Sequence, residues 1–518
     1  MGHGLRFLAA LLISALWLGC GRSGAPQGTS ASDRAAAAGR THELIIALQS
    51  DGVSLDPHTV SDAGSMRLIE NLYSTLLRYG EVYGEVEPDL ATSWTISEDG
   101  LVYTFRLRTN AVFQISGEVV TAEDVVYSLD RIRELGVRAS HFEPVAKVTA
   151  PDSFTVVITL TEPFAALLSY LAHPMNAVVD RRVAADQGLQ SKGGGSGPFR
   201  LERWRKDDRF RMVRHEAYHL DGRPRLDAVT FRPISDDTAR ITAMRNGEID
   251  VILDLAARDI DRLDGMPGVT VTSVPGTFWE YLGLNTTRPP FDDVRVRQAV
   301  AWAVDREVIN QLVKFGQALP LKGGPIPPNH WAHLDEVVYP AQDLDRARAL
   351  LAEAGVAPEA LKVDLLVGSD FAYQVQAAEV VKQQLRAAGL EVTVVSLESG
   401  MFFNRLGERD FDMALVGWLG FVDPDEWTYN LFRTGAPWNQ QGFSHPDVDS
   451  ALAEGRRLLD REQRKPVYDR VQRILTEQAP MVFLFINERA MAALDDVRGF
   501  EAHPTVTTLS LRDTWLER

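Results

Sequence analysis

Hydrophobic residues in the second half of the chain switch between two spacings. Residues 362–368, 391–397 and 411–418 are short apolar runs rich in β-branched side chains, a pattern that predicts buried strands. Residues 372–388 repeat their apolar positions with the period of a helix, and Gly389 suits the end of that helix. Strands that alternate with helices in this way predict a parallel sheet with helices packed on it, which indicates the α/β class.

The first half of the chain contains more strands and turns. Residues 43–50 predict a strand, and residues 65–80 predict a helix that ends at its terminal glycine. Apolar alternation on both sides of Asp99-Gly100 predicts a β-hairpin. A helix is predicted over residues 122–132, where Thr121 and Asp124 form a variant of the capping box.

Residues 281–307 interrupt this rhythm. A strand-like segment at 281–284 is followed by two prolines within 286–290, and Asp292 or Asp293 can then cap a long amphipathic helix. The apolar run at 481–487 predicts another buried strand later in the chain. We interpret these two segments as crossings between two lobes. The alternative is an ordinary strand-to-helix turn inside one domain.

Length and charge narrow the class of protein. A chain of 518 residues exceeds one ordinary core, so two or three lobes are expected. Its 45% hydrophobic and 24% charged residues are typical of a soluble globular protein. The formal net charge of -17 argues against a nucleic-acid partner, because nucleic-acid phosphates would be repelled.

The single cysteine, Cys20, excludes a disulfide within the chain and argues against a thiolate metal cluster. Arg6 precedes an apolar run that ends at this cysteine, and the run is too short to span a bilayer comfortably. This predicts a signal peptide over residues 1–19. Residues 20–40, rich in glycine, alanine and serine, predict a flexible tether.

The position of Cys20 resembles the lipobox of bacterial lipoproteins. That resemblance implies a lipid anchor on Cys20, which would hold the protein at a membrane. Trp17 stands where the lipobox prefers leucine, and cleavage followed by plain secretion is the alternative.

Four longer motifs occur in order along the chain. They are VEPDLATSW with SEDGLVYTF at 86–105, TAEDVVYSL at 121–129, NTTRPPFDDVRVRQA at 285–299, and GW with DPDEW at 417–427. In these motifs the chain resembles the extracytoplasmic solute-binding proteins of family 5, the peptide- and nickel-binding group of ABC importers.

The resemblance implies an α/β, two-lobed, periplasmic-binding-protein type II-like fold (Venus flytrap) with an extra subdomain in the first lobe. Lobe I is expected to comprise residues 41–285 and 487–518, with residues 77–194 as the subdomain. Lobe II is expected to comprise residues 286–486.

The resemblance also implies a transport function. The expected ligand is a small solute, with an oligopeptide or dipeptide first and a modified amine, sugar or metal chelate as alternatives. The expected partners are an ABC permease and its ATPase subunits, and the expected location is the bacterial cell envelope. We expect a monomer with no cofactor, no catalytic residue and no nucleic-acid partner.

Ligands of open α/β sheets bind beyond the carboxyl ends of the strands, and the strand at 411–418 leads to such an edge. Trp418 offers a flat apolar face, and Gly420 would let a ligand approach. In peptide-binding members of the family, an aspartate soon after the tryptophan holds the peptide amino terminus. That position falls at Phe421 here. Asp423 could take over this role, the solute could lack an α-amine, or Asp423 could only shape the turn.

Four further residues are candidates for the same site. Trp279 and Tyr281 precede the presumed crossing, where family members have aromatic residues in the pocket, and core packing is their alternative. Trp438 and Asn439 lie on the loop that follows the Trp418 segment and are weaker candidates.

The segment His215-Glu-Ala-Tyr-His219 matches the H-E-x-x-H pattern of zinc proteases. An alternating segment precedes it and a proline turn follows it, so the helix that would align the two histidines is not expected. No metal site is predicted. A zinc or carboxylate hydrolase and a ligand-sensing receptor partner with the same fold remain the alternative functions.

Overall fold

The computed structural model describes residues 42–518, apart from residues 136, 187, 337, 340 and 358–360. The signal peptide, the tether and Cys20 lie outside the described residues, and their assignments stay predictions. Within the described part of the chain, no helix has both the length and the apolar character needed to cross a membrane.

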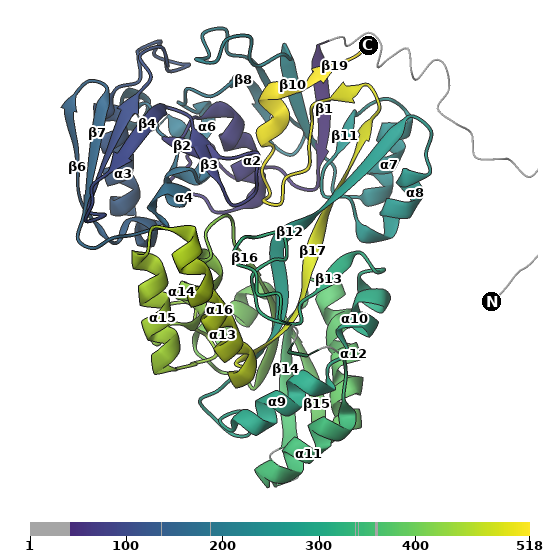
Figure 1. The fold of residues 1–518 in the computed structure, drawn as a ribbon. Helices are drawn as coiled ribbons and strands as arrows, with labels where there is room; N and C mark the ends of the chain where they lie inside the picture. Colours follow the sequence, from purple (N-terminus) through teal and green to yellow (C-terminus); the bar gives the residue numbers. More distant parts are fainter. Residues whose placement is uncertain (1–41, 136, 187, 337, 340, 358–360) are drawn as a thin grey trace, which may run out of the picture.

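One sheet of eleven strands runs through the molecule (Figure 1). Lobe II contributes β14 (Lys362–Gly368), β15 (Glu391–Leu397) and β16 (Met413–Leu419) to this sheet. A further short strand, β13 (Ala318–Pro320), pairs with β17. Lobe I contributes β11 (Val251–Ile252), β1 (Glu43–Leu48), β10 (Ala228–Pro233), β9 (Arg209–Arg214) and β8 (Phe199–Arg205).

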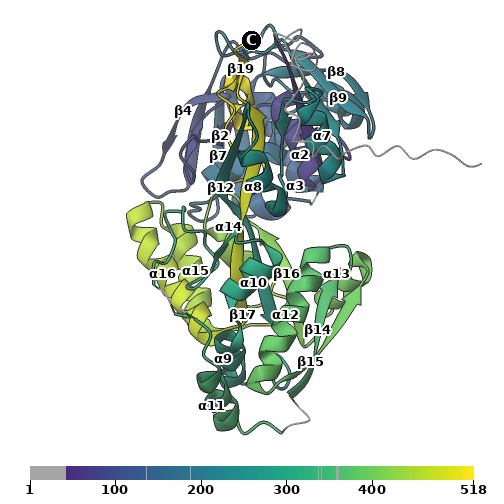
Figure 2. The ribbon, with the colours of Figure 1, turned by 90° about the vertical axis from the view of Figure 1, so that its right-hand side faces the viewer.

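Two long antiparallel strands join the lobes. β12 (Val269–Leu284) pairs with β17 (Met481–Leu494) in both lobes, and the register between them is interrupted between Pro275 and Trp279. Below this interruption β12 also pairs with β16. Figure 2 shows the two strands crossing together from the upper to the lower lobe. The two-lobed α/β architecture is thereby confirmed, whereas the exact lobe boundaries stay predictions.

Lobe II has the predicted alternation of strands and helices. β14 is parallel to both β15 and β16, and α12 (Ala372–Ala388) packs on it. The remaining helices around this sheet are α9 (Val294–Ala303), α10 (Arg306–Val313), α11 (Leu344–Ala354) and α13 (Ser399–Gly407).

The helix predicted after the crossing is two helices. Asp293 caps α9 by accepting the amide of Arg295 at 2.8 Å, which decides between the two expected caps. Val304 leaves the helical conformation, and Asp305 caps α10 through the amide of Val308 at 3.0 Å. A second capping residue in the sequence thus divides an apolar pattern that looks continuous.

The subdomain has its own four-stranded sheet. Its strands are β4 (Ala91–Ile96), β5 (Val102–Leu107), β7 (Thr155–Leu160) and β6 (Val145–Asp152), in that order, and α3 (Ala122–Leu135) covers them. The predicted hairpin turn is present, with Gly100 at a φ of 70°. The predicted capping variant is present too, because Thr121 donates from its amide and its hydroxyl to Asp124.

The helix predicted over residues 65–80 is wrong in its second half. α2 (Ala63–Leu72) ends at Leu72, and β2 (Leu77–Tyr79) pairs with β3 (Val86–Pro88). The amide of Gly197 donates a hydrogen bond to the Leu72 carbonyl at 3.0 Å, and the amide of Thr75 donates one to Asp89 at 3.0 Å. Contacts from distant parts of the chain therefore override the helical periodicity.

The other regular elements complete the two lobes. Lobe I also contains α4 (Leu167–Leu171), α5 (Arg181–Ala185), α6 (Leu189–Lys192), α7 (Asp237–Arg245), α8 (Ile260–Asp264), β18 (Val497–Arg498) and β19 (Trp515–Leu516). In lobe II, α14 (Asp425–Phe432), α15 (Pro446–Arg457) and α16 (Arg461–Gln478) lie directly below the subdomain (Figure 1).

Candidate functional site

The two lobes touch where α14, α15 and α16 meet the subdomain. The hydroxyl of Tyr170 donates to Asp425 across this contact at 3.3 Å, and the amide of Ala165 donates to the carbonyl of Arg456 at 2.7 Å. The Arg456 guanidinium also lies 4.5 Å from the centroid of the Phe164 ring. The two lobes are therefore in direct contact in this structure.

Exposed ion pairs surround the contact. Arg457 pairs with Glu162 at 2.9 Å, and Arg461 pairs with Glu85 at 3.5 Å. Pairs of this kind contribute about 0–1 kcal/mol each because water and salt screen them. These ion pairs therefore add little to the stability of the contact.

The segment after β16 forms the lobe II side of the contact. Glu426, in the first turn of α14, accepts the amides of Phe421 and Val422 with its Oε2 atom, the latter at 3.1 Å. Trp418 donates its indole proton to the Glu426 carbonyl at 2.8 Å. These bonds hold Phe421 against lobe I, where its ring centroid lies 4.5 Å from that of His173 and 6.5 Å from that of Tyr79.

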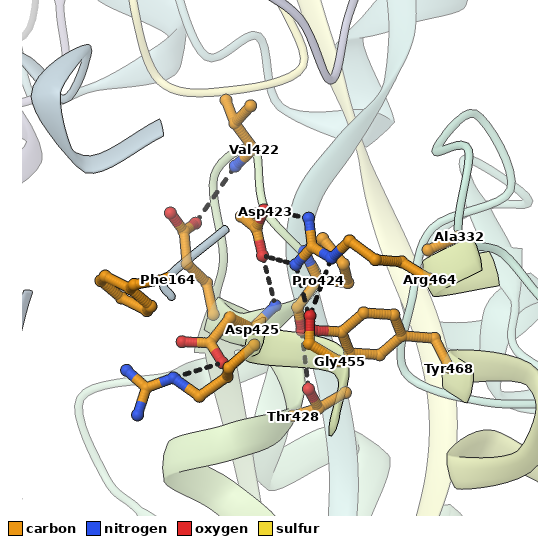
Figure 3. Close-up of polar contacts among 12 residues, drawn as sticks. Phe164, Ala332, Val422, Asp423, Pro424, Asp425, Thr428, Gly455, Arg464 and Tyr468 are labelled. Atoms are coloured by element: carbon orange, nitrogen blue, oxygen red, sulfur yellow. Dashed lines mark hydrogen bonds and ion pairs between the residues drawn. The ribbon is translucent and has the colours of Figure 1, made fainter. Parts of the chain in front are cut away.

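Asp423 is bound inside lobe II. Its two oxygens accept hydrogen bonds from Arg464 at 2.8 and 2.9 Å, and Arg464 also reaches the Tyr468 hydroxyl and the Gly455 carbonyl (Figure 3). Burial alone would raise the pKa of Asp423, but the charge and hydrogen bonds of Arg464 hold it below its ordinary value. Both carboxylate oxygens are engaged, so this geometry favours the structural role for Asp423 over capture of an amine.

Gly420 is required by a close contact within the protein. A Cβ atom at this position would lie 2.2 Å from the ring of Trp427, which is fully buried. This contact favours a role for Gly420 in the packing of α14, and its role towards a ligand stays a prediction.

Trp279 and Tyr281 lie in the core of lobe II. Trp279 is fully buried, with its ring centroid 4.8 Å from that of Tyr281 and 5.5 Å from that of Phe483. Trp279 is also the strand partner of Trp418. Core packing, the alternative for both residues, is the arrangement that these contacts favour.

The two candidate residues on the loop after α14, Trp438 and Asn439, have different surroundings. Asn439 is buried and bonds to the backbone of Arg433 and Phe443, so it fixes the loop. Trp438 is 50% exposed and meets Trp418 edge to face, with 5.7 Å between ring centroids. Trp438 therefore supports the outer side of Trp418.

Several buried side-chain oxygens near the lobe contact lack a hydrogen-bond partner among the described residues. We call five that also lack an ion pair the open oxygens: Glu70 Oε2, Tyr79 OH, Tyr83 OH, Thr277 Oγ1 and Glu426 Oε1. An unpaired buried polar atom costs about 1–3 kcal/mol. Water or a bound solute could supply the missing hydrogen bonds.

Burial and nearby charges raise the pKa values of three residues that carry open oxygens. Burial, followed by the charges of Glu426, Tyr83 and Glu70, raises the pKa of Tyr79 well above its ordinary value. Burial also raises the pKa of Glu426 to about 8, with the charge of Asp423 as the next cause. Burial raises the pKa of Glu70 to about 8 as well, against hydrogen bonds from Thr508. Carboxyl groups from both lobes thus lie within electrostatic range of one tyrosine.

A groove of about 700 Å³ opens where the subdomain meets α14. Asn430 and Arg433 line it from α14 and the residue that follows, and Arg133, Phe142 and other subdomain residues line it from the opposite side. Its volume suits a small solute. None of the residues that carry the open oxygens lines this groove.

Sequence reasoning missed Glu70, Tyr79, Tyr83 and Glu426. Tyr79 fell inside a predicted helix, and no role was predicted for Glu426. One signal was available: Glu426 follows the Trp418 strand and lies just beyond its carboxyl end, where ligands of such sheets bind.

The H-E-x-x-H segment has no metalloprotease geometry. Residues 215–219 form turns, His215 lies 3.1 Å from the Gly197 carbonyl, and His219 lies 3.2 Å from Asp89. Across the ranges that the structure describes, no group of three or more His, Cys, Asp or Glu side chains could hold a metal ion.

The fold and the contact between lobes define the class of two-lobed solute-binding proteins. The family model of bacterial extracellular solute-binding proteins, family 5 Middle, matches residues 85–440. The chain belongs to this family, whose members are binding proteins rather than enzymes. Their place is outside the cytoplasm.

Individual relatives extend over nearly the whole chain. The glutathione-binding protein GsiB of Escherichia coli O1:K1 / APEC is 26% identical over 490 residues, which cover 92% of this chain and 94% of that protein. DppA of Helicobacter pylori, solved in complex with peptide STSA, has a TM-score of 0.79 and 26% identity over 93% of this chain and 99% of its own. AgaA from A. tumefacien R10, solved with agropinic acid, has a TM-score of 0.79 and 28% identity over 92% and 99%.

Proposed function

We propose that this chain captures a small peptide-like solute between its lobes and delivers it to the permease of an ABC importer. The observation that carries the proposal is the set of open oxygens, contributed by both lobes at their contact. The names of relatives that bind glutathione and a short peptide support a peptide-like solute, an oligopeptide or dipeptide first. ATPase subunits on the far side of the membrane would drive the transport.

Closure about the β12–β17 crossing is the proposed mechanism. In an open form, the open oxygens of Tyr79 and Glu426 are hydrated separately. Closing brings Phe421 against Tyr79 and removes that water, and a solute with matching hydrogen-bonding groups replaces it. The solute then favours the closed form by the difference between its affinities for the two forms.

The proposed location follows from the amino terminus. Removal of residues 1–19 and lipidation of Cys20 would leave residues 20–40 as a tether between the membrane and a monomeric binding protein in the cell envelope. The intact mass of the mature protein from a membrane fraction tests this arrangement, because an unlipidated mass contradicts the anchor.

Binding is tested with a panel of probes from different chemical classes. The panel contains short peptides, glutathione, a disaccharide and a nickel–histidine chelate, added to protein freed of solute by unfolding and refolding. The proposal expects peptides or glutathione to raise the melting temperature. Stabilisation by the disaccharide or the chelate alone would contradict a peptide-like solute, and mass spectrometry of small molecules retained by natively purified protein identifies the natural one.

Trp418→Ala is expected to abolish stabilisation by these probes while the lobes stay folded. The variant removes the donor to the Glu426 carbonyl and the ring that supports the Phe421 segment. Melting temperatures with and without peptide measure the effect. Trp94→Ala, in the β4 strand of the subdomain, is the matched control and should keep the shift. A full shift in Trp418→Ala would remove Trp418 from the site.

A further inference from the structure

We propose that an arginine-lined cavity within lobe I binds the phosphate group of an organic ligand, at a site that solute capture does not use. The cavity has a volume of about 370 Å³, and Arg78, Arg223, Arg225 and Arg512 line it. This volume falls within the range of small-molecule sites, so the cavity has room for an organic phosphate. The inference goes beyond the proposed function and does not depend on it.

Three separate segments of lobe I bring the arginines together. Arg78 belongs to β2, Arg223 and Arg225 flank Pro224 in the turn before β10, and Arg512 lies in the C-terminal segment between β18 and β19. Figure 1 shows this C-terminal segment in yellow on the upper lobe. The site therefore exists only in the folded chain, and no local motif in the sequence indicates it.

Carboxylates neutralise only part of this positive charge. Arg223 and Arg512 share one carboxylate, that of Asp513, which Arg512 contacts at 2.9 Å. Arg78 pairs with Glu87 at 2.6 Å, and its buried Nε atom has no hydrogen-bond partner within the described part of the chain. Because a guanidinium carries five N–H donors, these pairs leave donors for an anion.

Arg225 is the least engaged of the four arginines. Its guanidinium lies 4.6 Å from the centroid of the Trp515 ring, and across the described ranges it makes no ion pair or hydrogen bond. Glycine at position 499 makes room for that ring, because a Cβ atom there would lie 2.8 Å from it. The ring therefore positions a guanidinium whose donors can all serve a ligand.

Three carboxylates line the same cavity and restrict where an anion can bind. Asp513 is held by two arginines, whereas Glu81 and Glu501 are exposed. Four arginines against three carboxylates give a positive lining in a chain whose formal net charge is -17. Water and salt screen the exposed glutamates most, so we expect the anion beside the partly buried side chains of Arg78 and Arg512.

The arrangement suits a phosphate better than a carboxylate. An arginine presents a planar fork that can donate two parallel hydrogen bonds to one phosphate. A phosphate monoester offers three strong acceptor oxygens and a carboxylate offers two, so several arginines can bind the phosphate at once. A soluble phosphate ester and the headgroup of an anionic phospholipid both present this group.

The site is complete within lobe I, although it lies next to the contact between the lobes. Among the described residues, those that line the cavity all belong to lobe I. Two of them also reach the contact: the Tyr79 ring stacks 6.5 Å from that of Phe421, and the His503 ring lies 6.3 Å from that of Tyr83. We therefore expect phosphate to bind both without and with a captured solute.

Calorimetric titration with soluble probes tests the inference. Glycerol 3-phosphate represents a soluble ester, glycerophosphoglycerol represents a phospholipid headgroup, and succinate is the carboxylate for comparison. Each probe is titrated into the full wild-type protein, into Arg225→Ala and into Arg225→Lys. The matched control is Arg203→Ala, which changes an exposed arginine of β8 outside the cavity.

The expected result is a loss specific to the phosphate probes. At least one of them should bind the wild type, and Arg225→Ala should weaken it by about tenfold, the lower end of the range for a hydrogen bond to a charged group. Arg225→Lys keeps the charge without the fork and should lose less. Arg203→Ala should bind like the wild type. The tighter probe identifies the source of the phosphate, and because Arg225 is exposed, its variants should keep the wild-type melting temperature.

Three results would overturn the phosphate site. They are no binding of either phosphate probe, unchanged affinity in Arg225→Ala, and succinate binding as tightly as the better phosphate probe. Failure of the whole solute panel, by contrast, would remove the proposed function and leave these titrations as the test of the cavity.

A last titration separates the cavity from the solute site. The better phosphate probe is added to protein saturated with the panel member that stabilises it most. Unchanged phosphate affinity supports a separate site. Loss of phosphate binding would assign the arginines to solute capture and contradict the inference.

Discussion

Replacing Asp423 by alanine is expected to lower the free energy of unfolding by about 3–5 kcal/mol. Arg464 is buried with Asp423 as its charged partner, and the variant leaves that guanidinium in a protein interior without a counter-ion. Urea unfolding followed by circular dichroism measures the loss. The loss should fall mainly on lobe II, where both residues lie.

Glu162→Ala is the matched control for Asp423→Ala. It breaks the exposed pair with Arg457, whose side chain is 59% exposed, and should cost no more than about 1 kcal/mol. Equal losses in the two variants would contradict the structural role of Asp423. In that event the Asp423 carboxylate would again be a candidate for binding a ligand.

Replacing Phe421 by alanine is expected to weaken the binding of any stabilising probe by about tenfold to a hundredfold. The ring packs on His173 and Tyr79 of the opposite lobe, and burying such a ring contributes about 1.5–3 kcal/mol. Because this contact exists only when the lobes are closed, the loss should appear in the affinity and hardly in the stability of solute-free protein.

Phe403→Ala controls for the loss of a phenylalanine elsewhere. Phe403 lies on α13 and is 48% exposed. Calorimetric titration of the two variants with the same probe compares them. If Phe421→Ala kept wild-type affinity, the contact between Phe421 and lobe I would not contribute to capture.

Much of the fold could be predicted because its signals are local. Each strand of lobe II is a continuous apolar run, and α12 carries one helical period from Ala372 to Ala388. The hairpin turn at Gly100 and the helix cap at Thr121 are each determined by residues that are close together in the sequence. Signals of this kind need no knowledge of the rest of the chain.

The sequence could not show those features that depend on a distant segment. The end of α2 depends on Gly197, which approaches the backbone of Leu72 so closely that a Cβ atom would lie 2.6 Å from it. The partner of Asp423 is Arg464, which lies on α16. A period of two along β12 says that Trp279 and Tyr281 share a face, but it does not say that this face packs inside lobe II.

The candidate site was harder to predict than the fold. The sequence pointed to the segment 418–432, and within it the residue with an open carboxylate oxygen is Glu426 rather than Asp423. The open hydroxyls of Tyr79 and Tyr83 come from a strand and a loop of lobe I. The charge of Glu426 acts on both hydroxyls from the opposite lobe, an effect that only the three-dimensional structure shows.

Small-angle X-ray scattering tests closure on a solute most directly. Solute-free protein is measured alone and then with a saturating amount of the panel member that gives the largest thermal shift. The account predicts that the radius of gyration falls on binding, and that Phe421→Ala needs more probe for the same change. Identical scattering before and after saturation would contradict capture by lobe closure.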